Sequence, residues 1–189
     1  MSVTVNVTKG QKVDLTKTNP GLKSLKIGLG WDVNKGSGGE FDLDGFIFGL
    51  NDQNKVLDSE SICYFGKLSI YGGAVVHSGD NLTGVGDGDD ETIVVNLSAV
   101  PANVEKLVIA VNIYQASSRS QNFGMVRNAF CRCYDGDTSQ ELMKYDLGEE
   151  YSTFEGVVFG ELYRNNGEWK FGAVSNGFNG DINSAIAMY

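Results

Sequence analysis

Acidic side chains gather in two short windows of this chain of 189 residues. The first window holds Asp32, Glu40, Asp42 and Asp44, and the second holds Asp80, Asp87, Asp89, Asp90 and Glu91. The chain has 24 acidic residues in all, and nine of them lie in these two windows. Calcium binds about six to eight oxygens, from carboxylates, amides, backbone carbonyls and water. The two windows therefore predict a divalent-cation site.

The second window, residues 78–91, has the composition of a tightly folded loop. It carries four glycines beside its acids, and Ser78, Asn81 and Thr83 add short oxygen-bearing side chains. On a strand, Asp42 and Asp44 would point to the same face, because side chains alternate from one face to the other. A solvated acidic loop is the alternative interpretation of such a charge run. Glycines among the acids, together with two aspartates on one face, favour the metal.

The familiar calcium motif does not fit either window. Around Asp42 the acids have the spacing of an EF-hand loop, but Asn51 stands where that loop has its bidentate glutamate. Residues 46–50, FIFGL, are typical of a strand rather than of the helix that should follow the loop. Any calcium site here is of another kind.

Other site chemistries have weaker support. His77 is the only histidine, and the three cysteines lack the spacing of zinc ligands. Residues 84–88 have the spacing of a glycine-rich phosphate loop, but their aspartates would repel phosphate. Paired carboxylates can hydrolyse glycosides, although nothing in the sequence marks two acids with opposed environments. We expect a protein that is not an enzyme.

The net charge of the chain disfavours nucleic acid and anionic membranes as partners. The chain has 15 basic and 24 acidic residues, a net charge of -9, and 41% hydrophobic residues. Such a charge repels nucleic acid and anionic lipid headgroups.

The amino terminus lacks the apolar stretch of a signal peptide, and no apolar run is long enough to span a bilayer. Three cysteines form no disulfide framework. We expect a cytoplasmic protein that binds no nucleic acid and does not insert directly into membranes.

Short β-branched and aromatic runs with turn residues between them predict an all-β protein. Strands are expected at 3–7, 25–31, 41–50, 61–65, 92–97, 106–114, 126–134, 141–147, 154–164 and 168–174. Residues 135–137 and 165–167 have hairpin-turn chemistry. Short helical pieces are expected at 117–124 and 181–188. We predict an antiparallel β-sandwich that forms a single domain over residues 1–189.

Six segments of the sequence resemble the TerD family of bacterial tellurium-resistance and stress-response proteins. They are GLGWD (28–32), FDLDG (41–45), GDNLTGVGDGDDE (79–91), RSQNFGMVRNAF (119–130), YDLGEEYS (145–152) and GELYRNNGEWKF (160–171). The resemblance covers nearly the whole chain in the family's order, and the segment 79–91 is long and unusual. It implies a calcium-binding β-sandwich linked to resistance against tellurite, some phage and colicins, with no established enzymatic activity.

By motif, the resemblance implies one set of cation ligands: Asp32, Asp42, Asp44, Asp80, Asn81, Asp87, Asp89, Asp90 and Glu91. Their number exceeds the needs of one calcium ion, so two ions are expected. The favoured function is a calcium-binding module that acts by contact with other stress-response proteins, a membrane-bound partner among them. The alternatives are a metal-dependent enzyme, a cyclic-nucleotide-binding member of the family, and an acidic β-domain that binds basic partners.

Overall fold

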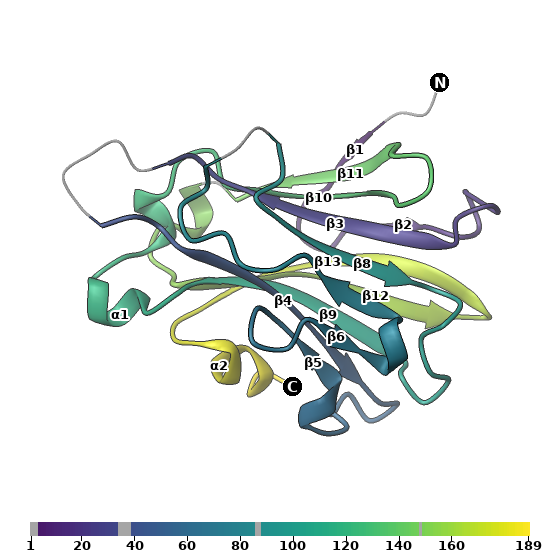
Figure 1. The fold of residues 1–189 in the computed structure, drawn as a ribbon. Helices are drawn as coiled ribbons and strands as arrows, with labels where there is room; N and C mark the ends of the chain where they lie inside the picture. Colours follow the sequence, from purple (N-terminus) through teal and green to yellow (C-terminus); the bar gives the residue numbers. More distant parts are fainter. Residues whose placement is uncertain (1–3, 34–38, 86–87, 148) are drawn as a thin grey trace.

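Two β-sheets lie face to face in the computed structural model, which describes residues 4–33, 39–85, 88–147 and 149–189 (Figure 1). The seven-stranded sheet has the order β1-β11-β10-β3-β8-β7-β6, and the six-stranded sheet has the order β2-β13-β12-β9-β4-β5. The predicted β-sandwich with short helical pieces is confirmed.

The strands of the seven-stranded sheet are β1 (Val5–Asn6), β3 (Ser24–Gly30), β6 (Ser69–Ile70), β7 (Val75–His77), β8 (Glu91–Asn96), β10 (Phe130–Asp135) and β11 (Glu141–Asp146). Those of the six-stranded sheet are β2 (Lys12–Asp14), β4 (Leu43–Leu50), β5 (Ile62–Cys63), β9 (Lys106–Ile113), β12 (Gly156–Asn165) and β13 (Glu168–Phe178). The α-helices are α1 (Ala116–Arg119) and α2 (Ile182–Ile186). Short 3₁₀ turns lie at Ser59–Ser61, Tyr71–Gly73, Phe123–Met125 and Glu149–Tyr151.

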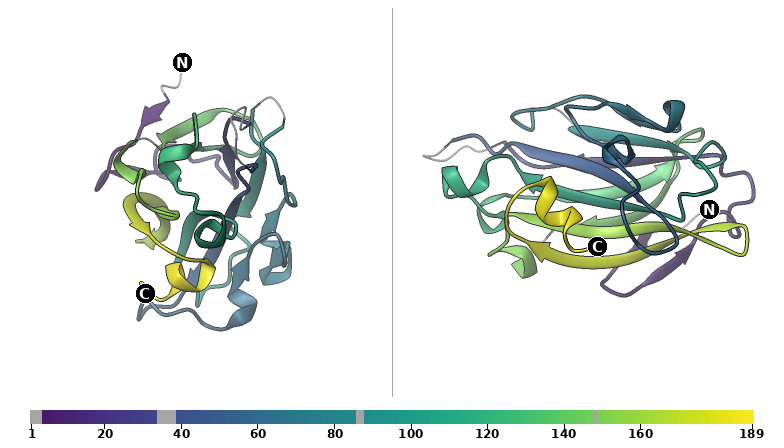
Figure 2. Two further views of the ribbon diagram at one scale, coloured as in Figure 1. Left: turned by 90° about the vertical axis from the view of Figure 1, so that its left-hand side faces the viewer. Right: turned by 90° about the horizontal axis from the view of Figure 1, so that it is seen from below.

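Strand β4 is buried on both of its faces, which explains its nearly unbroken apolar sequence. Leu43 and Ile47 point into the main core between the sheets. Phe46 and Phe48 point the other way, into a second apolar cluster that includes Ala185 of α2. Figure 2 shows α2 lying across the outer face of the six-stranded sheet. Asp42 and Asp44, in phase with Phe46, therefore stand on this outer face.

Turn chemistry joins β12 to β13 as predicted. Asn166 and Gly167 have φ values of 52° and 78°, both in the left-handed region. A two-residue hairpin of this type requires positive φ at both positions, and Asn-Gly supplies it at low cost. The long hairpin carries Trp169 and Phe171 into the main core.

Several short elements depart from the predictions. Strands β2, β6 and β7 were not expected, since runs of two or three residues leave little periodic signal. Strand β1 pairs with β11 in parallel, so the sheet is not wholly antiparallel. Val3, at the start of the first predicted strand, lies outside the described residues. In the described part of the chain, no helix combines the length and the apolar character needed to cross a membrane.

Candidate metal centre

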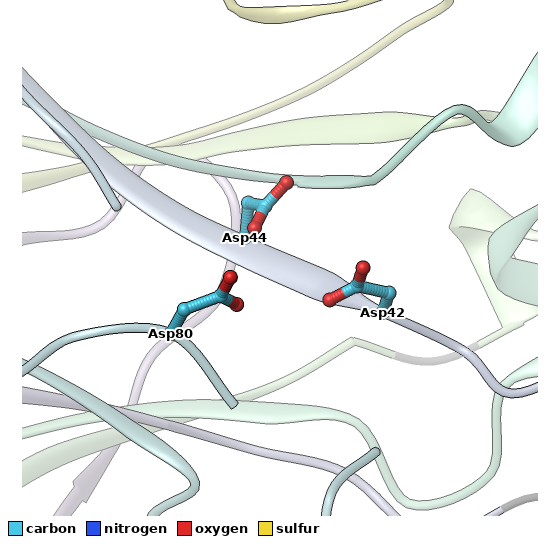
Figure 3. A group of neighbouring side chains, drawn as sticks. All are labelled: Asp42, Asp44 and Asp80. Atoms are coloured by element: carbon cyan, nitrogen blue, oxygen red, sulfur yellow. The ribbon is translucent and has the colours of Figure 1, made fainter. Parts of the chain in front are cut away.

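Three of the predicted ligands come together in the fold: Asp42, Asp44 and Asp80. Each offers a carboxylate oxygen, and these oxygens all lie within 4.8 Å of one another. Figure 3 shows Asp42 and Asp44 facing Asp80. Asp80 comes from a separate segment of the chain. The exposed fraction is 5% for Asp42 and 3% for Asp44, whereas Asp80 is exposed. The cluster thus has two buried carboxylates and one at the surface.

Local backbone geometry places each member of the cluster. The carbonyl of Asp42 accepts a hydrogen bond of 2.7 Å from the Tyr114 N–H, which extends the β4–β9 pairing beyond the strand. Asp44 is paired across β4 and β9 with Asn112. Asp80 follows Gly79, whose φ of 108° is a conformation that favours glycine. This turn after β7 brings the Asp80 carboxylate to the other two.

Burial and mutual repulsion disfavour the charged forms of the two inner aspartates. Burial raises the pKa of Asp44 to about 8, with further contributions from the carboxylates of Glu91, Asp42 and Asp80. Burial also raises the pKa of Asp42 to about 6, with a contribution from Asp80, and Arg119 opposes this shift. A bound cation would remove this repulsion and favour the ionised carboxylates.

Three buried oxygens near the cluster lack hydrogen-bond partners among the described residues. They are Oδ1 of Asp42, Oδ1 of Asn112 and Oε1 of Gln121. Gln121 lines the same surface hollow as Asp42, and its amide nitrogen donates to the Glu40 carbonyl at 3.1 Å. Buried polar atoms normally have partners, so unpaired oxygens beside carboxylates fit a site for a cation that prefers oxygen.

Sequence reasoning did not select Asn112 or Gln121. Asn112 is the one polar residue in the apolar run 107–113. A single amide inside a strand that is buried on both faces is the signal that could have identified it. Gln121 belongs to the family-like segment 119–130 and carries no local signal of its own.

Two other predicted ligands line a different hollow of about 790 Å³. Asp90 accepts a hydrogen bond of 2.9 Å from the Trp31 N–H, and one of 3.2 Å from the amide of Asn81. Asp32 accepts a bond of 2.8 Å from the Asn128 amide. Burial raises the pKa of Asp90. These acids tie the 78–91 loop and the end of β3 to their surroundings, apart from the three-aspartate cluster.

Asn81 also shapes its own loop. Its side-chain oxygen accepts hydrogen bonds from the N–H groups of Thr83 and Gly84, at 3.2 and 3.1 Å. This pattern is a local turn in which the side chain replaces a backbone acceptor. Asp87, a further predicted ligand, lies outside the described residues.

Asp89 has cationic and hydroxyl partners on the seven-stranded sheet. Its carboxylate accepts a bond of 2.6 Å from Nε of Arg132 and another from the hydroxyl of Tyr134. The carboxylate lies directly over Gly28, where a Cβ would be only 2.3 Å from its atoms. The bond to Asp89 is the main cause of the raised pKa of Arg132. Arg132 thus has a structural role as the partner of Asp89.

Glu91 is 1% exposed and is enclosed by hydrogen-bond donors. It accepts bonds from the N–H groups of Gly45 at 2.8 Å and Asn81 at 3.2 Å. His77 lies beside it, with Nε2 at 3.5 Å from Oε2. The histidine Nδ1 accepts from the Gly79 N–H, and Nε2 contacts the Gly45 carbonyl at 3.0 Å. His77 is the last residue of β7.

Comparison with known proteins gives consistent results over the whole length of the chain. The TerD domain family matches residues 3–189. General stress protein 16U of Bacillus subtilis (strain 168) is 51% identical over 181 residues, which are 95% of this chain and 94% of the relative. Tellurium resistance protein TerD of Serratia marcescens is 43% identical over 187 residues, 99% of this chain and 97% of the relative.

A solved structure supports the fold. A homologue of telluride resistance protein (TerD) from Streptomyces coelicolor A3(2) superposes with a TM-score of 0.73, covering 86% of this chain and 94% of its own. Its sequence identity is 23%, so this likeness concerns the fold alone. The family match and the two sequence relatives agree with the resemblance of the acidic segments: the chain is a member of the TerD family of tellurium-resistance and stress-response proteins.

Proposed function

We propose that this TerD-family protein binds calcium through Asp42, Asp44 and Asp80 and acts as a non-enzymatic interaction module in the stress response. The observation that carries the proposal is the meeting of three carboxylates, two of them buried, beside buried oxygens with no hydrogen-bond partner among the described residues. Ionised aspartates at this depth need a compensating positive charge.

The donor set favours a hard divalent cation. All the candidate ligands are oxygens, from the three aspartates and from the amides of Asn112 and Gln121. Calcium accepts mixed carboxylate and carbonyl oxygens in a flexible geometry, whereas magnesium demands a near-ideal octahedron and keeps several waters. The ring of His77 is already held by Gly79 and Gly45, which leaves it poorly placed as a zinc ligand.

Bound calcium would link separate parts of the chain. Asp44 lies in β4 of the six-stranded sheet and Asp42 directly precedes that strand, whereas Asp80 lies in the loop that follows β7 of the other sheet. The ion would neutralise the inner carboxylates and fix this loop. The proposed consequence is a calcium-dependent surface for other stress-response proteins, a membrane-bound partner among them, in the cytoplasm.

We propose a binding role rather than a catalytic one for the aspartates. Here burial raises the pKa of both Asp42 and Asp44. This shared direction suits replacement of protons by a cation. The alternatives of a metal-dependent enzyme and a cyclic-nucleotide-binding protein have no comparable support.

Thermal unfolding in EDTA, in millimolar magnesium and in millimolar calcium tests the proposal. A ligand at one hundred times its Kd stabilises the folded state by about 2.7 kcal/mol per site. For a chain of this size the melting temperature should rise by roughly 5–10 °C. We expect this rise with calcium and a smaller one with magnesium.

The variants Asp44→Asn and Asp80→Asn should fold and lose most of the calcium-induced rise. Asp52→Asn, in an exposed turn, serves as the matched control and should keep it. An unchanged calcium response in both site variants would place the ion elsewhere. The absence of any calcium response in the wild-type protein would refute calcium binding.

A further inference from the structure

A groove of about 750 Å³ lies beside the second apolar cluster, on the outer face of the six-stranded sheet. Its lining includes Ile182 and other residues of α2, and also Tyr64 and Phe65, which follow β5. The segment from Asn112 to Ser118, at the end of β9 and in α1, completes the lining. Volumes of this size are typical of small-molecule sites. The proposed calcium site does not use these aromatic residues.

Three half-buried aromatic rings meet nearly at right angles in the groove. The Tyr64 and Phe65 centroids are 5.3 Å apart with an interplanar angle of 81°. The Phe65 and Tyr114 centroids are 5.9 Å apart at 89°. All three residues line the groove. Because the rings pack edge to face, they do not close into a parallel stack, and all three border the groove with part of their aromatic surface.

Acidic side chains stand in the same lining. Glu155 is fixed by the Ser117 hydroxyl at 2.7 Å and by the Gly180 N–H at 2.8 Å. Asp181 caps the first turn of α2 through bonds to the N–H groups of Asn183 and Ser184. Asp44 also lines the groove. Glu155 and Asp181 thus place fixed acceptors and negative charge beside the space.

Positive side chains are missing from the lining, as far as the described residues show. The nearest candidate, Arg119, lies with Cζ at 5.4 Å from the Tyr114 centroid, and it lines the neighbouring hollow with Asp42 instead. Tyr114 borders both spaces. With a net charge of -9 on the chain, an anionic ligand would be repelled from the groove.

We propose that this groove binds a small organic cation, with its substituted ammonium group in the corner formed by Tyr64, Phe65 and Tyr114. Aromatic faces attract ammonium groups through their quadrupoles, and quaternary ammonium ions are the best-known ligands of aromatic cages. The acids nearby add Coulombic attraction. The rest of the ligand lies along α2, since the groove is larger than an ammonium group alone.

Choline and its uncharged isostere 3,3-dimethylbutan-1-ol are suitable probes, because they have the same shape and differ in charge. Binding to the full chain is measured by isothermal titration calorimetry in EDTA, so that the result does not depend on calcium. We expect choline to bind, and the isostere to bind about tenfold more weakly or not at all. Equal binding of the two compounds, or no binding of choline, would overturn the proposal.

Ring variants locate the site. Phe65→Leu and Tyr114→Leu should each weaken choline binding about fivefold to tenfold. Tyr114→Phe keeps the ring and should bind within about twofold of the wild type. Melting temperatures show whether each variant is folded. If folded leucine variants bound choline as the wild type does, the corner would not be the site.

Discussion

The two acidic windows give rise to two kinds of carboxylate in the folded protein. Asp89 and Glu91 are held by donors of the chain, namely Arg132 and Tyr134 for the first and backbone N–H groups beside His77 for the second. Asp42 and Asp44 face another acid, Asp80. A buried carboxylate with donors stabilises the fold, whereas a buried carboxylate facing other acids is costly without a cation.

This comparison separates structural acids from candidate ligands more sharply than charge density does. Both kinds are enclosed by the protein, with Glu91 at 1% and Asp44 at 3% exposure. The difference lies in the neighbours. Replacing a structural acid should destabilise the protein with or without calcium, and replacing a ligand should change mainly the response to calcium. The following predictions test this division.

Among the substitutions, the largest effect is expected for Glu91→Ala. The substitution leaves the buried N–H of Gly45 and the partly buried N–H of Asn81 without their acceptor, and it removes the carboxylate beside His77. We expect a loss of roughly 3 kcal/mol in the free energy of unfolding, by urea denaturation in EDTA. Glu91→Gln keeps one acceptor oxygen and should lose less. A loss in Glu91→Ala below about 1 kcal/mol would contradict the structural role.

The second effect is a change with pH in the stability of the protein without calcium. The pKa of Asp44 is raised to about 8 in the folded state, above the value of the unfolded chain. At pH values between the pKa of Asp44 in the unfolded chain and its pKa in the folded protein, the folded protein binds more protons than the unfolded one. The stability of the folded state should therefore fall as pH rises from 5 to 8. The limiting slope for one such group is about 1.4 kcal/mol per pH unit.

Urea unfolding of calcium-stripped protein at several pH values measures this slope. Comparison with Asp44→Asn isolates the contribution of that carboxyl, because other titrating groups are common to both proteins. Asp44→Asn should show a flatter profile. Saturating calcium should reduce the wild-type decline, since the ion competes with protons for the same oxygens. Parallel profiles for the two proteins in EDTA would show that Asp44 does not titrate in this range.

A third, smaller effect is expected for Asn112→Val. The buried Asn112 oxygen has no hydrogen-bond partner in the described structure, and valine suits a buried strand. Without calcium, the variant should gain roughly 1 kcal/mol of stability, because an unsatisfied polar atom is removed. With calcium, its melting temperature should rise less than that of the wild type. A loss of stability in EDTA combined with an unchanged calcium response would remove Asn112 from the site.

The sequence predicted the local parts of this arrangement. Period-two alternation placed Asp42 and Asp44 on one face, and the Asn-Gly pair set the β12–β13 turn. It did not predict that Glu91 is enclosed and Asp80 is exposed, although both lie in the same acidic window. That distinction depends on partners distant in sequence. Arg132, for example, is 43 residues from Asp89.

The two-sided burial of β4 also escaped prediction. The run FIFGL was correctly assigned to a strand, but the cover on its second face comes from α2 at the opposite end of the chain. Without that cover, Asp44 would have been expected at a solvated surface with an ordinary pKa. The buried environment that makes the three aspartates a candidate metal centre is therefore a property of tertiary packing.

The smallest effect is expected for Tyr134→Phe on the structural side of the comparison. The change removes one donor from Asp89 and leaves its bond to Arg132 in place. We expect a loss of about 0.5 kcal/mol, measured by urea unfolding, and the same loss in EDTA and in calcium. Since Asp89 accepts from Arg132 and Tyr134 across the sheet, a change there should not reach the three aspartates. If Tyr134→Phe also reduced the calcium-induced rise in melting temperature, Asp89 would have to be counted with the ligands.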